Sequence, residues 1–125
     1  MKEAIKTGLP EFGRPVEWAT KGGGLLLTTA VPIKADGSFE TGEARGQIAL
    51  ALDNLETAVK AGGGTLADVL QVMVHLTDPE HIPALNEEWA TRFVPPYPSR
   101  AIIIVKAIGV PGIVIMMQVF ANIDG

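Results

Sequence analysis

Cysteine is absent from the 125 residues of the chain, which excludes disulfide bonds, a thiolate nucleophile and a thiolate metal site. Aromatic residues make up only 6% of the sequence and charged residues 19%, whereas hydrophobic residues make up 47%. A chain of this length buries about two-thirds of its unfolded surface. The composition therefore predicts one folded domain over residues 1–125, with a substantial apolar core.

Long apolar runs and basic clusters are also missing. No stretch approaches the ~18 consecutive apolar residues of a membrane span, and the N-terminus contains no apolar segment of signal-peptide length. We therefore expect a cytoplasmic protein without a membrane partner. The net charge of −4 argues against nucleic acid as a partner, because phosphate backbones attract basic surfaces.

Motifs for metal or nucleophilic chemistry are missing as well. The two histidines, His75 and His81, do not have the spacing of a metal-ligand pair, and there is no His-Glu-x-x-His motif. No Gly-x-Ser-x-Gly motif indicates a Ser-His-Asp triad. We expect neither a metal site nor a covalent nucleophile.

Apolar periodicity predicts the secondary structure. Residues 44–59 have helical spacing, with Thr41 as the N-cap and glycines 62–64 at the C-terminus. Asp78 and Pro79 begin a second helix. Its predicted buried stripe is Ile82, Leu85, Trp89 and Phe93. The predicted strands are a hairpin in 15–33 with its turn at glycines 22–24, then 68–78, 101–108 and 113–123, with an additional short strand in 3–7.

This order of elements is that of an α+β fold with a mixed sheet of five or six strands. Two helices cover only one face of such a sheet. Residues 102–105 and 113–117 are consecutively apolar, which indicates that both faces of the last two strands are covered. We therefore predict a closed homo-oligomer, in which copies of the chain cover the second face.

Arg100 lies between a proline-rich turn, residues 94–98, and the apolar strand that follows. Its guanidinium is permanently charged and forked, so it binds carboxylates through two hydrogen bonds, most strongly where it is partly desolvated. A small anionic molecule is the natural partner of such a side chain. The alternative is an internal ion pair with an acidic residue such as Glu87 or Glu88.

Several stretches together resemble the Rid (YjgF-type) family of enamine/imine deaminases in order and spacing. They are GGGLLLTTAVPI, AGGGTLADVLQVMVHLTD, LNEEW, PYPSRAIIIVKAI and VIMMQVFANI. The resemblance covers nearly the whole chain, residues 12–123. It implies a chorismate-mutase-like fold with two helices on one face of the sheet, a homotrimer with three sites in the clefts between subunits, and no cofactor.

In that family, the arginine corresponding to Arg100 binds the carboxylate of an imino acid such as 2-iminopropionate, the tautomer of 2-aminoacrylate. Water then adds to the C=N carbon and ammonia leaves, which gives a 2-keto acid. The resemblance therefore implies a hydrolytic deaminase in which Arg100 clamps the substrate. Asn86 matches the family's Asn-Glu pair and is expected at the substrate, although a structural hydrogen bond on the second helix is the alternative interpretation.

The sequence departs from the family pattern at the residue that orients the water. The family's glutamate on the last strand is Gln118, which holds a water by hydrogen bonds but cannot transfer a proton at neutral pH. Alternatively, Gln118 is a polar residue at a subunit seam. Two hypotheses follow: a deaminase with Arg100 and Gln118 as its catalytic residues, or a non-catalytic small-molecule-binding or regulatory trimer.

Other positions expected at the substrate also depart from the family pattern. They are Thr28, Thr29, Ile102, Glu17 and Trp18. The two threonines stand where the family has Ser and Gly, and they are good strand formers whatever they bind. Trp18 is also interpreted as a packing residue, and Glu17 as a replacement acid or a solvated charge. Ile102 and Val16 predict a more apolar pocket than is usual in the family, suited to a larger substrate.

Overall fold

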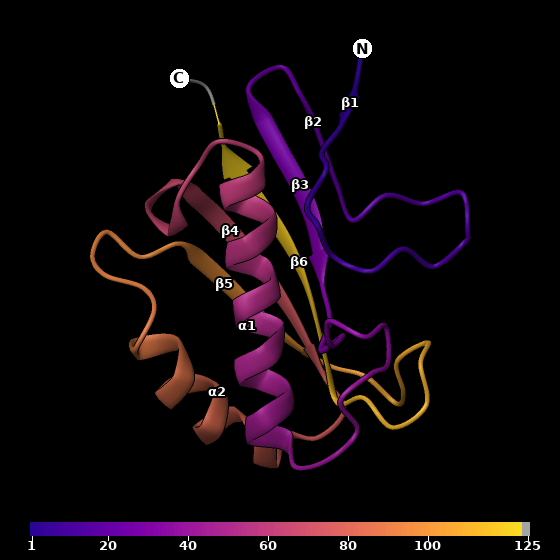
Figure 1. Cartoon of the computed structure of the whole chain (residues 1–125). Helices are drawn as coiled ribbons and strands as arrows, with labels where there is room; N and C mark the ends of the chain where they lie inside the picture. The colour runs from indigo at the N-terminus through magenta and orange to yellow at the C-terminus, as the bar shows by residue number, and fades with distance from the viewer. Residues whose placement is uncertain (124–125) are drawn as a thin grey trace.

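The computed structural model of the chain describes residues 1–123, which form six strands and two helices (Figure 1). The strands are β1 (Glu3–Ala4), β2 (Ala19–Gly22), β3 (Leu25–Ala30), β4 (Val69–Leu76), β5 (Ser99–Ile104) and β6 (Ile115–Asn122). The helices are α1 (Ala44–Ala61) and α2 (Ile82–Ala90), and two short 3₁₀ turns are η1 (Leu66–Asp68) and η2 (Pro79–His81). No helix in this part of the chain is long and apolar enough to cross a membrane.

The six strands form one mixed sheet in the order β1-β2-β3-β6-β4-β5. β4 and β5 pair in parallel, because α2 provides the crossover that a parallel connection requires. β2 and β3 form the hairpin that was predicted around glycines 22–24. Both helices lie on one face, in front of the sheet in Figure 1. The predicted α+β fold with two helices on a six-stranded sheet is therefore confirmed.

Helix α1 forms because apolar residues recur along its buried face. Those that are at most 1% exposed include Ile48, Leu52, Leu55 and Val59. The predicted glycine stop is confirmed. The N–H of Gly64 donates to the carbonyl of Val59, and Gly63 adopts a φ of +98°, which favours glycine.

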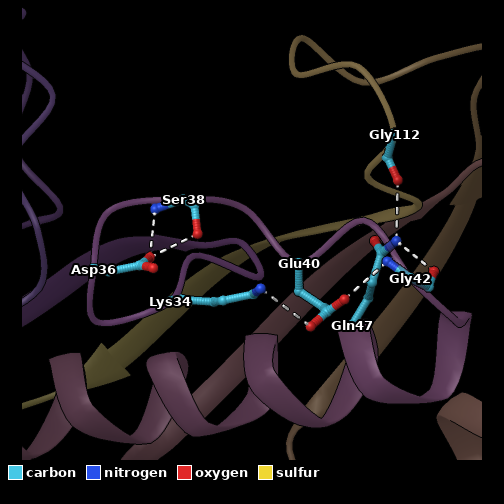
Figure 2. A network of polar contacts seen from close by, with 7 residues as sticks. All are labelled: Lys34, Asp36, Ser38, Glu40, Gly42, Gln47 and Gly112. Atoms are coloured by element: carbon cyan, nitrogen blue, oxygen red, sulfur yellow. Dashed lines mark hydrogen bonds and ion pairs between the residues drawn. The ribbon is translucent and has the colours of Figure 1, made fainter.

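The start of α1 differs from the prediction. The N-cap is Glu43, whose backbone is extended and whose side chain makes no capping hydrogen bond. The Glu40 carboxylate accepts the N–H of Gly42 at 2.9 Å (Figure 2), which fixes a turn ahead of the helix. Thr41 belongs to that turn, so the prediction of Thr41 as the N-cap is wrong.

Asp78 and Pro79 begin the helical segment as predicted, but the 3₁₀ turn η2 comes first and leads into α2. The Asp78 carboxylate accepts the N–H of Glu80 at 2.8 Å and caps η2, which leads into α2. The predicted stripe is confirmed: Ile82 is partly buried against the core, and the residues at most 8% exposed are Leu85, Trp89 and Phe93.

Strand β5 differs from the predicted range 101–108. It begins at Ser99 and ends at Ile104, opposite Leu76, the last residue of β4. Because β4 ends there, residues 105–114 leave the sheet and form a loop.

The apolar residues form two clusters. The larger lies between the helices and the sheet, and the smaller surrounds Val31, Ile33 and Ile113. Within residues 1–123, no helix lies on the opposite face of the sheet, where Leu25 and Leu27 are each 43% exposed. We call this the open face. An apolar open face is what the predicted homo-oligomer requires, and the oligomer itself stays a prediction.

Candidate ligand-binding site

Arg100 lies on β5, an edge strand, and its side chain packs against α2. One guanidinium nitrogen donates to Oδ1 of Asn86 at 2.8 Å, and the guanidinium carbon lies 4.8 Å from the centroid of the Trp89 ring. Trp89 is 8% exposed and contacts Phe93, with ring centroids 4.3 Å apart. Ile102, two residues after the arginine, packs against the main core. Arg100 is thus held at one edge by an amide and on one face by an aromatic ring.

The charge of Arg100 is not neutralised within residues 1–123, where no carboxylate forms an ion pair with it. Glu87 and Glu88, the alternative partners, pair with Arg45 at 3.1 and 3.3 Å. Burial lowers the pKa of the Arg100 guanidinium from its ordinary value, because desolvation disfavours the charged form. An anion that reached this side chain would therefore make a charge-assisted and partly desolvated contact.

Gln118 lies on β6, on the open face. It pairs with Thr29 of β3 on one side and with Met73 of β4 on the other. An open cleft of about 260 Å³ lies beside it, which we call the glutamine cleft. The predicted site residues that line it are Glu17, Trp18, Thr28, Thr29 and Gln118.

One wall of the glutamine cleft is held to the sheet through Trp18. The indole N–H of Trp18 donates to the carbonyl of Pro10 at 2.7 Å, and the hydroxyl of Thr28 donates to the carbonyl of Trp18 at 2.7 Å. Thr28 is only 5% exposed, so its hydroxyl serves the fold, whereas Thr29 is exposed on the open face. Trp18 therefore packs against its neighbours and also lines the cleft.

The sheet separates Arg100 from Gln118. Arg100 pairs with Val72 of β4, and Gln118 pairs with Met73, the next residue of the same strand. Successive residues of a strand point to opposite faces. Arg100 accordingly lies on the helix side and Gln118 on the open face, so one copy of the chain does not bring them into a common site.

Neither histidine lies in a metal site. His75 Nδ1 is 3.3 Å from the carbonyl oxygen of Met116, and His81 lies in η2. Across residues 1–123, no group of three or more His, Cys, Asp or Glu side chains is arranged to hold a metal ion.

The fully buried side chain of Gln47 joins α1 to the loop 105–114, a role that the sequence-based prediction missed. Its amide nitrogen donates to the carbonyls of Gly42 and Gly112 at 3.2 and 3.0 Å (Figure 2). Its oxygen accepts the N–H of Val114 at 2.7 Å. Gln47 thus fixes the end of the loop that returns to β6.

A second buried amide, Asn54, was also missed. Its nitrogen donates to the carbonyls of Val31 and Ile33 at 2.8 and 2.9 Å, which fixes the segment after β3. The signal was available: Gln47 and Asn54 are seven residues apart on α1, which puts both on its buried stripe. Buried amides find hydrogen-bond partners, so their position indicates contacts with backbone outside the helix.

Comparisons with known proteins agree with this fold. The sequence model of the family described as Endoribonuclease L-PSP matches residues 12–123. Protein mmf2, mitochondrial, from Schizosaccharomyces pombe is 30% identical over 99 residues, which are 79% of each chain. The crystal structure of RidA from the Antarctic bacterium Psychrobacter sp. PAMC 21119 has a TM-score of 0.87 and 24% identity, over 96% of this chain and 98% of that one. The structure of E. coli TdcF with bound serine has a TM-score of 0.84 and 19% identity, over 96% and 98%.

The chain is a small α+β protein with a fixed arginine on an edge strand and an open cleft on the opposite face of the sheet. The match over residues 12–123 gives the family: the chain belongs to the Rid (YjgF/RutC, L-PSP) family. The resemblance seen in the sequence is thereby confirmed, and the two solved structures confirm the fold.

Proposed function

We propose that the protein is a hydrolytic deaminase of small anionic enamines and imines of the 2-aminoacrylate/2-iminopropionate type. The observation that carries the proposal is Arg100, whose guanidinium is fixed by Asn86 and Trp89 while no carboxylate within residues 1–123 pairs with it. A substrate carboxylate would supply the missing anion through two hydrogen bonds. TdcF, which shares the fold, has been seen with bound serine, and serine carries a carboxylate.

We propose that the site forms between copies of the chain in a homotrimer. Arg100 and Gln118 lie on opposite faces of the sheet, so a second copy is needed to bring an arginine to the glutamine cleft. The apolar open face, with Leu25 and Leu27 exposed, is the surface that the copies would share.

At such a composite site the reaction requires mainly positioning. Arg100 holds the carboxylate, and a water bound to Gln118 attacks the C=N carbon. The water transfers one proton to the imine nitrogen, which gives a carbinolamine. A second proton then passes from the hydroxyl to the nitrogen as the C–N bond breaks, releasing ammonia and a 2-keto acid. Because an amide is not an acid at neutral pH, these protons would move through water.

A second candidate function is a non-catalytic small-molecule-binding or regulatory trimer. Gln118 favours it, because the family's glutamate is missing at this position. The substitution Gln118→Glu separates the two candidates. Deaminase activity that appears only in the variant would mark a site that lacks its acid and would support the binding function for the natural chain.

Two further expectations stay part of the proposal. A cytoplasmic location is proposed from the sequence, although the relative mmf2 is described as mitochondrial.

RNA, the substrate that the family description suggests, is disfavoured because the net charge of −4 offers no attraction to phosphates.

The test generates 2-aminoacrylate in place with a pyridoxal-phosphate-dependent dehydratase and follows release of the 2-keto acid. We expect the protein to accelerate release over buffer and Arg100→Ala to abolish the acceleration. No acceleration with several amino-acid precursors would contradict the deaminase. Acceleration that Arg100→Ala leaves unchanged would contradict the role of the arginine.

A further inference from the structure

A second open cleft of about 290 Å³ adjoins the glutamine cleft on the open face. The two clefts share Glu17, Trp18 and Thr29 in their linings, so they are direct neighbours on either side of these residues. We call the second one the apolar cleft. Any group bound beside Gln118 therefore lies next to a second open space, on the other side of Trp18.

The lining of the apolar cleft is almost entirely hydrocarbon and aromatic. Its apolar residues include Val16, Val31, Phe39, Val110, Ile113 and Met116. Among its lining side chains only Glu17 and Thr29 are polar, and both lie on the side that it shares with the glutamine cleft. Protein interiors are close-packed, whereas ligand sites are apolar clefts with a few polar groups. A hollow of this size within the smaller apolar cluster has the composition of a ligand site.

The two buried amides of α1, Gln47 and Asn54, make hydrogen bonds to the backbone of two segments that form walls of the apolar cleft. Asn54 holds the carbonyls of Val31 and Ile33, and Gln47 holds the backbone on either side of Ile113. Figure 2 shows Gln47 reaching from α1 to Gly112 in this loop. A hollow whose walls are anchored in this way is formed before a ligand arrives, which reduces the cost of binding.

We infer that the apolar cleft receives the side chain of the substrate, and that this side chain is a bulky branched aliphatic or aromatic group. The inference rests on the proposed function, which sets the carboxylate on Arg100 of one copy and the C=N carbon beside Gln118 of another. The remaining substituent on that carbon then extends from the glutamine cleft past Trp18. Of the two residues from which a more apolar pocket was predicted, Val16 lines this cleft, whereas Ile102 packs in the main core.

Binding of 2-keto acids to the full-length protein tests the inference without requiring turnover. Titration calorimetry compares pyruvate, 2-oxobutanoate, 4-methyl-2-oxopentanoate and phenylpyruvate. Each methylene that becomes buried should tighten binding about fourfold, so 4-methyl-2-oxopentanoate should bind at least about tenfold more tightly than pyruvate. Equal affinities would overturn the inference and leave the proposed function intact. Failure of all four to bind would contradict both, through the loss of the carboxylate site.

Side chains that fill the apolar cleft should remove the preference for 4-methyl-2-oxopentanoate over pyruvate. Val110→Trp and Val16→Trp add bulk from two separate loops, so the test survives if one loop rearranges. In both variants we expect the ratio of the two affinities to fall toward one. Thr57→Trp adds the same bulk on the exposed side of α1 and should keep the wild-type ratio. A preference that persists in both filling variants, with the fold confirmed by circular dichroism, would overturn the inference.

Discussion

Arg100 and Gln118 lie on opposite faces of the same sheet, and the two regions hold their side chains differently. Arg100 sits on regular structure, between an edge strand and α2, and is held by Asn86 and Trp89. Gln118 lies in a cleft on the strands β2, β3 and β6, next to an apolar cleft whose walls include loops that buried amides of α1 hold. The Arg100 region would supply the positive charge that binds a carboxylate, and the clefts beside Gln118 would supply the space for the rest of a ligand. A site that combines both needs two copies of the chain.

The largest effect is expected from a charge placed in the middle of the open face. Met73 lies on β4 between Ala101 of β5 and Gln118 of β6. Burying an unpaired lysine there would cost several kcal/mol in each copy, so Met73→Lys should turn a trimer into a monomer at micromolar concentration. Analytical ultracentrifugation measures the change, and circular dichroism checks the fold.

The matched control for this experiment is Thr57→Lys on the exposed side of α1, which should remain trimeric. If the natural chain itself sediments as a monomer, or if Met73→Lys leaves a trimer unchanged, the open face is not the surface that the copies share.

Removing the charge should have the next largest effect. Arg100→Ala should weaken binding of 2-keto acids by about 2–5 kcal/mol, which is the usual loss when one partner of a buried charged pair is truncated. The affinity of Arg100→Lys should lie between those of the natural chain and of Arg100→Ala, because lysine keeps the positive charge but cannot make two parallel hydrogen bonds. Calorimetry gives both values.

Arg92→Ala is the control for the arginine, because Arg92 pairs with Asp53 and Glu88 and is not expected at the ligand. It should leave the affinity unchanged. An equal loss in Arg92→Ala and Arg100→Ala would show a general effect of charge rather than a clamp.

The next prediction concerns the buried amide Gln47, which holds the loop beside the apolar cleft and whose loss should lower the free energy of unfolding. Gln47→Leu leaves the N–H of Val114 and the carbonyls of Gly42 and Gly112 without this partner, and each buried unsatisfied group costs about 1–3 kcal/mol. Because the two glycines are exposed, we expect a loss of about 2 kcal/mol in the free energy of unfolding. Urea denaturation at one fixed protein concentration measures it.

The comparison for Gln47 is Ser38→Ala, which removes an exposed hydrogen bond from the Ser38 hydroxyl to Asp36 in a turn. Its effect should stay within about 0.5 kcal/mol. Equal losses in the two variants would show that Gln47 does not anchor the loop.

The smallest effect on ligand affinity is expected from replacing the Trp89 ring, against which the Arg100 guanidinium packs. Trp89→Phe keeps an aromatic ring in the core but offers a weaker surface to the guanidinium, so binding of 2-keto acids should weaken by about 0.5–1 kcal/mol. A loss as large as that of Arg100→Ala would mean that Trp89 acts through the fold rather than through this contact. Thermal melting of the variant distinguishes the two.

The sequence was informative where structure is local and periodic. The stripes of both helices, the glycine stop at Gly63 and the hairpin at glycines 22–24 all follow from spacing or turn chemistry. Thr41 failed as a cap because a carboxylate three residues before the cap position fixed a turn there. The early end of β5 also lay outside local reasoning, since it depends on where its partner strand stops.

The candidate site was predictable by residue type and not by arrangement. Arg100 was singled out by its chemistry, and its contacts with Asn86 and Trp89 join residues that the sequence had already marked. That Arg100 and Gln118 face opposite ways depends on the pairing register of three strands. The partners of Gln47 on the loop are 65 and 67 residues away, so no local pattern names them.

The central claim is that one copy supplies the arginine and another supplies the glutamine cleft. A crystal structure of the protein with bound 4-methyl-2-oxopentanoate tests it most directly. We predict the carboxylate on Arg100 of one copy, the keto carbon beside Gln118 of a second copy, and the branched side chain in the apolar cleft. A ligand held on Arg100 by α2 and β5 of a single chain, with no residue of another copy in contact, would contradict the account.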